Sequence, residues 1–191
     1  MTAIPRQMMD EFCAYLADND ISFQRQDHAP AMVTFDFALD EELGRVTVQT
    51  FFSENGYSLS ASMDRSATRK TRQAVLEYAN MINFWEKTGN FEMYYELGVV
   101  FFRLEVMHAG EAPLPLEVVE RSVRLTKQMY KKYAAGFAAL MAGTAKDPEK
   151  VFRQAAAPSE GTPPTQDRRP QLIVLQGGKK TRGDMGKSPA P

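Results

Sequence analysis

The fold is decided by residues 44–63, which read GRVTVQTFFSENGYSLSASM. On both sides of Asn55-Gly56, apolar residues alternate with polar ones, a pattern typical of strands that bury one face. Asn55 and Gly56 tolerate the positive φ angles of a type I′ turn, so we expect a tight antiparallel hairpin. The alternation points these side chains toward the core: Val46, Val48, Phe52, Tyr57, Leu59, Ala61 and Met63.

The segments before and after this hairpin carry their own periodicity. Spacings of three and four between apolar residues predict helices, whereas alternation predicts further strands. Gly98 divides a second pair of strands, and Pro113 and Pro115 mark the entry to a long helix. The remaining expected elements are a helix over 6–17, a strand over 33–39, a helix over 66–87, strands over 91–97 and 100–106, and a helix over 116–142, with residues 148–156 compatible with a further short helix.

The order α-βββ-α-ββ-α predicts an α+β fold, with a five-stranded antiparallel sheet and helices packed on one face. The other face of the sheet is expected to be largely polar, because Thr, Ser, Gln and charged residues occupy the alternate positions of the strands. Three aromatic residues share the parity of that outer face, namely Phe51, Tyr94 and Phe101.

Composition changes after residue 157. All 20 aromatic residues (12 Phe, 7 Tyr and 1 Trp) lie at or before Phe152, while residues 158–191 hold six of the 11 prolines. This last segment has 6 Lys/Arg and 3 Asp/Glu, a net charge of +3, against 17 and 21, a net charge of −4, in residues 1–157. We therefore expect a folded domain over 1–157 and a disordered, Pro/Gly-rich basic tail over 158–191. The apolar tetrad Leu172–Leu175 is an exception that could instead add a strand to a sheet edge.

The composition argues against several classes of protein. A net charge of −1 gives no strong field toward nucleic acid or an acidic lipid surface. No apolar run approaches the about 18 residues of a membrane span, and the N-terminus lacks the apolar core of a secretory signal. The single cysteine, Cys13, cannot form an intramolecular disulfide. We therefore expect a cytoplasmic protein that binds neither nucleic acid nor a membrane.

No constellation of residues indicates catalysis. Cys13 lies far along the chain from the two histidines, His28 and His108, and their spacing does not suggest a nucleophilic pair. The carboxylates within 36–42 lack the pattern of a calcium loop and are interpreted as a solvated acidic turn. Basic residues within 65–72, at the expected start of a helix, leave open a contact with phosphate or an acidic partner. We predict no catalytic, cofactor-binding or metal-binding residues.

The second half of the domain carries a recognisable order of short motifs. The helix end YANMINFW at 78–85 is followed by GNFEM at 89–93, a hairpin at Gly98, VFFR at 100–103 and a proline-led helix that begins LEVVE at 116–120. This order resembles the YbjN-domain family of bacterial proteins. The resemblance implies a fold similar to type III secretion chaperones, which are small, cytoplasmic, commonly dimeric proteins that bind extended segments of partners. The family is linked with regulation and sensory transduction, and the resemblance implies no known reaction.

The helix over 66–87 has more apolar residues than one buried face needs. Because each residue advances about 100° around a helix, Phe84 lies roughly 200° from Ile82, and the two cannot enter one narrow core. We therefore expect a non-enzymatic, homodimeric protein-binding module, chaperone-like or regulatory, that binds another protein or peptide through exposed apolar surface. The expected contact residues are Met81, Phe84, Trp85, Tyr94 and Phe101. The alternative is a small-molecule sensor with a pocket between sheet and helices, and an enzyme with an unrecognised site is a third hypothesis.

Overall fold

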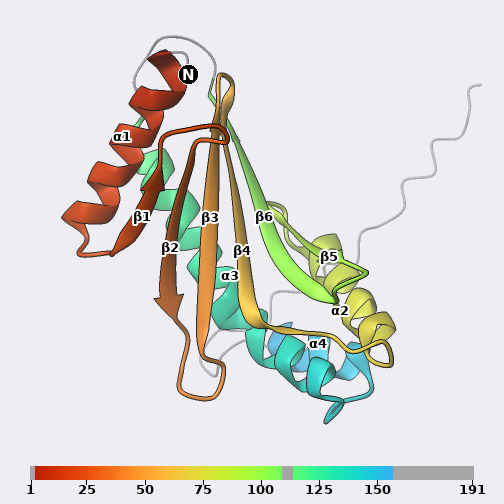
Figure 1. Ribbon diagram of the computed structural model, residues 1–191. Helices are drawn as coiled ribbons and strands as arrows, with labels where there is room; N and C mark the ends of the chain where they lie inside the picture. Colours follow the sequence, from red (N-terminus) through yellow and green to blue (C-terminus); the bar gives the residue numbers. More distant parts are fainter. Residues whose placement is uncertain (1–2, 109–113, 157–191) are drawn as a thin grey trace, which may run out of the picture. The chain divides into compact units, whose positions relative to one another are not determined.

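The computed structural model describes residues 3–108 and 114–156, which form an α+β fold with one antiparallel sheet and four helices (Figure 1). The helices are α1 (Ala3–Asp18), α2 (Arg72–Trp85), α3 (Leu116–Ala142) and α4 (Pro148–Ala156). The strands are β1 (Phe23–Gln26), β2 (Met32–Ala38), β3 (Arg45–Ser53), β4 (Gly56–Ser66), β5 (Asn90–Tyr94) and β6 (Val99–Met107).

The sheet has the spatial order β1-β2-β3-β4-β6-β5, and every neighbouring pair is antiparallel. The hairpin expected at Asn55-Gly56 is confirmed, with Ser53 opposite Gly56 and Val46 opposite Met63. The second expected hairpin joins β5 and β6 through a turn at Gly98, whose N–H bonds to the carbonyl of Tyr94 at 2.9 Å.

The prediction of five strands is wrong, because β1 adds a sixth and the order becomes α-ββββ-α-ββ-α-α. The sequence of β1 reads Phe-Gln-Arg-Gln and so contains one apolar residue and no alternation. Tertiary contacts hold this strand instead. It pairs with β2, and the Arg25 guanidinium binds Asp10 of α1 at 2.6 Å and Asp27 at 2.7 Å.

The prediction that the second helix begins near residue 66 is also wrong. Strand β4 continues to Ser66, which lies opposite Val99 of β6 after an irregularity in the register. Asp64 is therefore a strand residue, and α2 begins at Arg72 with Thr71 as its N-cap residue. Of the four basic residues within 65–72, expected at the start of this helix, only Arg72 lies in α2.

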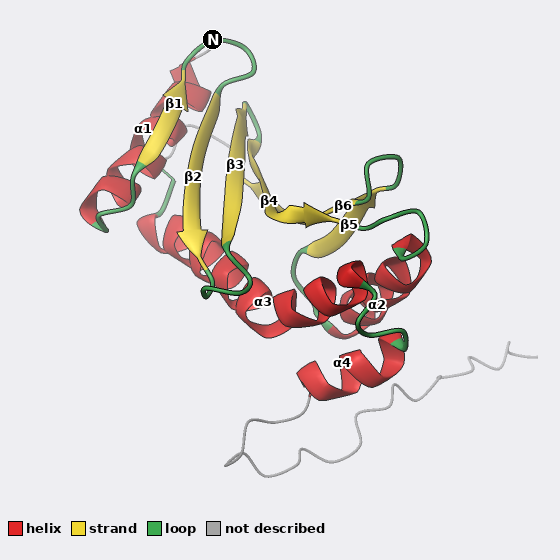
Figure 2. Ribbon diagram, turned by 60° about the horizontal axis from the view of Figure 1, so that its bottom comes forward, coloured by secondary structure: helices red, strands yellow, loops and turns green. Residues whose placement is uncertain are grey.

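The helices lie on one face of the sheet (Figure 1), and a second view shows α3 running behind the strands with α2 and α4 beside it (Figure 2). Helix α1 contacts β2 and β3, α3 contacts β4 and β6, and α2 contacts β5. Buried tyrosines connect the layers. Tyr130 of α3 donates to the carbonyl of Ala61 at 2.5 Å, and the Tyr57 hydroxyl lies 2.8 Å from that of Ser122. This face holds the core.

The opposite face is polar, as the alternation predicts, and Figure 1 shows no helix of the described residues in front of it. Its exposed or half-buried residues include Thr34, Asp36, Thr47, Gln49, Ser58, Ser60, Ser62, Glu92 and Arg103. Phe101 is half-buried there because the Arg103 guanidinium lies over its ring at 5.3 Å.

Two further sequence-based expectations concern the tail and membrane-spanning helices. The expected tail, residues 158–191, lies outside the residues that the structure describes, as does the segment Leu172–Leu175. Within 3–108 and 114–156, no helix combines the length and the apolar character needed to cross a bilayer.

Candidate functional site

The C-terminal end of α2 is fixed to the sheet by a side-chain amide. Asn83 donates from Nδ2 to the carbonyl of Phe91 at 2.8 Å, and its Oδ1 accepts the Phe91 N–H at 2.7 Å. The Glu86 N–H bonds to the carbonyl of Ile82 at 2.8 Å and closes the last turn. Both ends of this short segment are therefore anchored, and the residues between Asn83 and Glu86 have a defined direction.

Those intervening residues, Phe84 and Trp85, project away from the core. Phe84 is 68% exposed and Trp85 is 48% exposed, whereas Ile82 is 0% exposed, so the separation of Phe84 from Ile82 expected from helix geometry is confirmed. The two rings contact each other edge to face, with centroids 5.9 Å apart and an interplanar angle of 82°. Met81 is half-buried and precedes them by three and four residues, which places all three on one side of α2.

The side chain of Glu86 also fixes the end of α2, through contacts with α3. Tyr133 of α3 donates to its Oε1 at 2.5 Å and Lys132 donates at 2.9 Å. Partial burial raises the pKa of the Glu86 carboxyl, but these two hydrogen bonds and the charge of Lys132 together outweigh burial and hold the pKa below its usual value. Burial, together with the Glu86 carboxylate, raises the pKa of the Tyr133 hydroxyl. Phe84 and Trp85 thus form the last two residues of a helix whose end is held by α3 and β5.

The five residues expected to bind a partner do not form one patch. Tyr94 of β5 is 58% exposed and lies on the outer face of the sheet, opposite Val99, while Phe101 is half-buried beside it. Met81, Phe84 and Trp85 lie on a helix that packs against the other face. The structure therefore brings Met81, Phe84 and Trp85 together and separates them from Tyr94 and Phe101.

The prediction of a strand over 91–97 is wrong at its end, because β5 ends at Tyr94. Tyr95 (53% exposed) and Leu97 (63% exposed), which alternate with Phe91 and Met93 in the sequence, lie in the β5–β6 turn instead. Arg72 at the start of α2 supports this turn. Its guanidinium lies over the Tyr95 ring at 5.5 Å and donates to the carbonyl of Glu96 at 2.9 Å.

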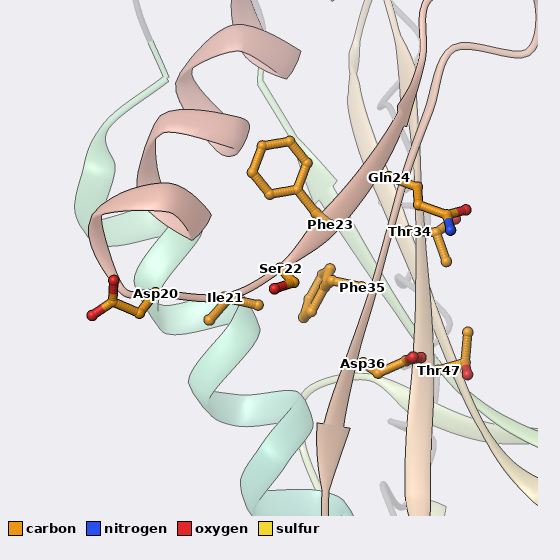
Figure 3. A pocket seen from close by; sticks show the side chains of 9 residues that line it. All are labelled: Asp20, Ile21, Ser22, Phe23, Gln24, Thr34, Phe35, Asp36 and Thr47. Atoms are coloured by element: carbon orange, nitrogen blue, oxygen red, sulfur yellow. The ribbon is translucent and has the colours of Figure 1, made fainter.

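A hollow of about 690 Å³ lies at the opposite end of the sheet, where β1 meets β2. Figure 3 shows Gln24, Thr34, Asp36 and Thr47 directed to one side of the strands there, and Phe23 and Phe35 to the other. It opens at the surface rather than between sheet and helices, where the sensor hypothesis places a pocket.

Two features of the described residues bear on catalysis and metal binding. Cys13 is buried in α1, and burial raises the pKa of its thiol, which disfavours the reactive thiolate. In the described part of the chain, no three His, Cys, Asp or Glu side chains converge on a point where a metal ion could bind.

Comparison with protein-family models and with curated proteins gives no match for this chain. The resemblance to the YbjN-domain family remains a prediction from the sequence.

Proposed function

We propose that this protein is a non-enzymatic protein-binding module of chaperone-like or regulatory type that acts as a homodimer in the cytoplasm. Its contact surface is the helix end formed by Met81, Phe84 and Trp85, with Tyr94 and Phe101 forming a second, smaller contact on the sheet. The resemblance to the YbjN-domain family agrees with this proposal. It supplies no partner by name.

The observation that carries the proposal is the anchored aromatic pair. Large aromatic side chains are enriched among the residues that dominate protein interfaces, because they bury much area at little cost in conformational entropy. Phe84 is 68% exposed and Trp85 is 48% exposed, yet Asn83 and Glu86 hold the backbone on both sides of them. A surface that is apolar, exposed and held in place is suited to receive a partner.

The alternative sensor hypothesis has weaker support. The space between sheet and helices contains large side chains that are fully buried, including Phe12, Tyr78, Phe102 and Phe137. A metabolite that raises the melting temperature in a saturable way would favour the sensor, since a ligand that binds only the native state stabilises it.

Sedimentation velocity at micromolar concentration tests the proposal. The wild-type chain should sediment as a dimer, and the variant Phe84→Ser/Trp85→Ser should shift toward the monomer with the far-UV circular dichroism unchanged. Leu116→Ser is the matched control, because Leu116 is 59% exposed at the start of α3, away from the aromatic pair. A wild-type chain that is strictly monomeric would overturn the dimer, and an effect of Leu116→Ser equal to that of the double variant would overturn the assigned surface.

A further inference from the structure

Strand β6 is longer than the strand that covers its outer edge. Its residues Val99–Arg103 pair with the five residues of β5, and the last of these pairs joins Arg103 to Asn90. Figure 1 shows β6 continuing past β5 toward the hairpin between β3 and β4. Within the described residues, the last four positions of β6, Leu104–Met107, therefore have a strand on one side only, namely β4.

The ladder between β4 and β6 shows which backbone groups face the free side. Next to the last pair of this ladder, His108 donates to the carbonyl of Asn55 at 2.9 Å, so even-numbered residues of β6 direct their backbone groups toward β4. Consecutive residues of a strand face opposite sides, so Glu105 and Met107 direct theirs away from β4. Among residues 3–108 and 114–156, no strand pairs with that side of Glu105 and Met107.

An apolar floor lies beneath this free half of β6. Lys132 of α3 donates to Glu86 at the end of α2, which marks the side of α3 that faces α2 and the β5–β6 side of the sheet. Leu125 and Val118 precede Lys132 by seven and fourteen residues, about two and four helical turns, so they lie on the same side of α3. Both are partly buried against the core, as is Val106 of β6. A strand added beside β6 would direct every second side chain toward this floor.

The free half of β6 begins near the aromatic pair, Phe84 and Trp85. Gly89 follows Trp85 by four residues, and a Cβ atom added to Gly89 would lie 2.9 Å from the carbonyl oxygen of Arg103. Arg103 is the last residue of β6 that β5 covers. Four residues span at most roughly 14 Å, so the aromatic pair and the free edge are neighbouring surfaces.

A stable dimer needs more area than the aromatic pair provides. Specific interfaces bury about 800 Å² on each partner. An aromatic side chain buries about 150–250 Å², so Phe84 and Trp85, at 68% and 48% exposure, together offer roughly 250 Å². The remaining area has to come from surface next to the pair. The free edge of β6 supplies such surface, including Met107, which is 79% exposed.

Other open stretches of sheet edge suit a second copy less well. The last positions of β2, Asp36–Ala38, are covered by β3 alone, but a dimer there would bring together the exposed carboxylates of both copies: Asp36, Asp40, Glu41 and Glu42. The outer edge of β1 belongs to a strand with one apolar residue, Phe23. At β5, the side chain of Asn83 occupies the N–H and C=O of Phe91. At β6, by contrast, Glu105 has a cation beside it, because Arg103 lies 3.9 Å from its carboxylate.

We propose that two copies of this chain pair their β6 strands antiparallel, with Glu105 opposite Met107 of the second copy and the two Val106 residues opposite each other. The inference rests on the homodimer proposed above and names the strand that joins its copies. In this register the backbone groups that face the free side exchange hydrogen bonds. A two-fold axis at Val106 makes the contact self-complementary. Glu105 lies opposite an apolar side chain, so the register opposes no like charges.

Amide hydrogen exchange of the full chain, read at single residues by mass spectrometry, tests the proposal. The Glu105 and Met107 amides should exchange about tenfold more slowly at about a hundred times the dimer Kd than at about a tenth of it, because the fraction of free chain falls by that factor. The Leu104 and Val106 amides face β4 in monomer and dimer alike. They serve as internal controls and should respond much less to concentration.

Two variants at one position test the register. Met107→Lys and Met107→Glu remove the same exposed apolar side chain and differ in the sign of the charge placed opposite Glu105 of the second copy. The dimer Kd should be about tenfold lower in Met107→Lys than in Met107→Glu, because two attractive cross-strand pairs replace two repulsive ones.

A proline tests the backbone pairing. Met107→Pro removes an N–H that faces the free side and leaves the bonds to β4 in place, so it should weaken the dimer with the far-UV circular dichroism unchanged. Ala38→Pro is the matched control. Leu39, the next residue, donates to the carbonyl of Gly44 before β3, so Ala38 directs its N–H away from β3, at an edge outside the proposed contact. Ala38→Pro should therefore keep the wild-type Kd.

The results separate this contact from the homodimer on which it rests. A wild-type dimer whose Glu105 and Met107 amides exchange at the same rate at both concentrations would overturn the β6 contact and leave the homodimer standing. Equal Kd values for Met107→Lys and Met107→Glu, or for Met107→Pro and Ala38→Pro, would do the same. A wild-type chain that is strictly monomeric would overturn the homodimer and this contact with it.

Discussion

Replacing Gly136 by alanine should destabilise the protein, although alanine is the better helix former. Gly136 lies in the C-terminal half of α3, next to Tyr78 of α2 and Val151 of α4. A Cβ atom at this position would lie 2.3 Å from the hydroxyl oxygen of Tyr78 and 2.7 Å from Cγ1 of Val151. Tyr78 cannot move aside easily, because it is fully buried, donates to the carbonyl of Tyr133 at 3.3 Å and contacts the Phe137 ring at a centroid distance of 4.8 Å.

Two effects of opposite sign decide how much the free energy of unfolding changes in Gly136→Ala. Removing glycine from a helix interior contributes about 1 kcal/mol of stability. Adding a methyl group to a filled core costs about 1–3 kcal/mol, and contacts this short from two different helices place Gly136 at the upper end. We expect a net loss of about 1–2 kcal/mol. For a domain of this size each kcal/mol corresponds to about 2–4 °C, so the melting temperature should fall by about 2–8 °C.

Urea unfolding and thermal melting of Gly136→Ala provide the measurement. Ala135→Gly is the matched control, because Ala135 is exposed in the same helical turn and reports the helix-propensity effect alone, a loss of about 1 kcal/mol. In a Val151→Ala background the cost of Gly136→Ala should shrink, since one of the clashing atoms is gone. If Gly136→Ala instead stabilises the chain by the amount that propensity predicts, the close packing of α2, α3 and α4 described above is wrong.

Three further predictions concern the core, the helix end and pH. The Thr50 hydroxyl is buried without a partner among the described residues, so Thr50→Val should raise the free energy of unfolding by about 1 kcal/mol or more, and a loss measured in urea would contradict this. Ile82→Ala should lower the free energy of unfolding by about 2–5 kcal/mol. Phe84→Ser should leave the unfolding midpoint nearly unchanged and weaken self-association in sedimentation. An equal loss of stability in both variants, with the oligomer unchanged, would show that the two side chains are equally buried. Burial raises the pKa of Tyr57 to about 12, against a hydrogen bond with Ser122 that lowers it, while the unfolded value is about 10. The unfolded state therefore ionises first, and stability is lost as pH rises from about 10 to about 12; Tyr57→Phe should lose less over this range in alkaline unfolding curves, and an identical loss would refute the assignment.

The sheet could be predicted where burial and alternation coincide. Strands β3 and β4 bury every second residue, and the pairing of Val46 with Met63 follows from the turn at Asn55-Gly56. Strand β1 could not be predicted, because Arg25 is held by ion pairs with residues on α1 and in the following turn. Strand β1 is stabilised by tertiary contacts, which a local pattern of apolar and polar residues cannot reveal.

The candidate site could also be predicted only in part. Helix geometry predicts that Phe84 points away from Ile82, and the exposed fractions of 68% and 0% confirm this. The role of Asn83 could not be predicted, since its two bonds to Phe91 depend on where α2 ends against β5. The need for glycine at position 136 could not be predicted either, because the close approach of Tyr78 involves two helices far apart in the sequence.

Two surfaces of the described residues differ in the chemistry that they offer to a partner. The pair Phe84 and Trp85 offers apolar side-chain area, so binding there should respond weakly to salt. The edge at Asp36–Ala38, where β2 extends beyond its pairing with β1, offers backbone N–H and C=O groups beside exposed carboxylates. Binding there should require an extended segment and weaken as salt increases. Because the two surfaces lie on separate elements, Phe84→Ser should leave the hydrogen exchange of the Asp36 amide unchanged. A change in that exchange rate would show that the two surfaces are not independent.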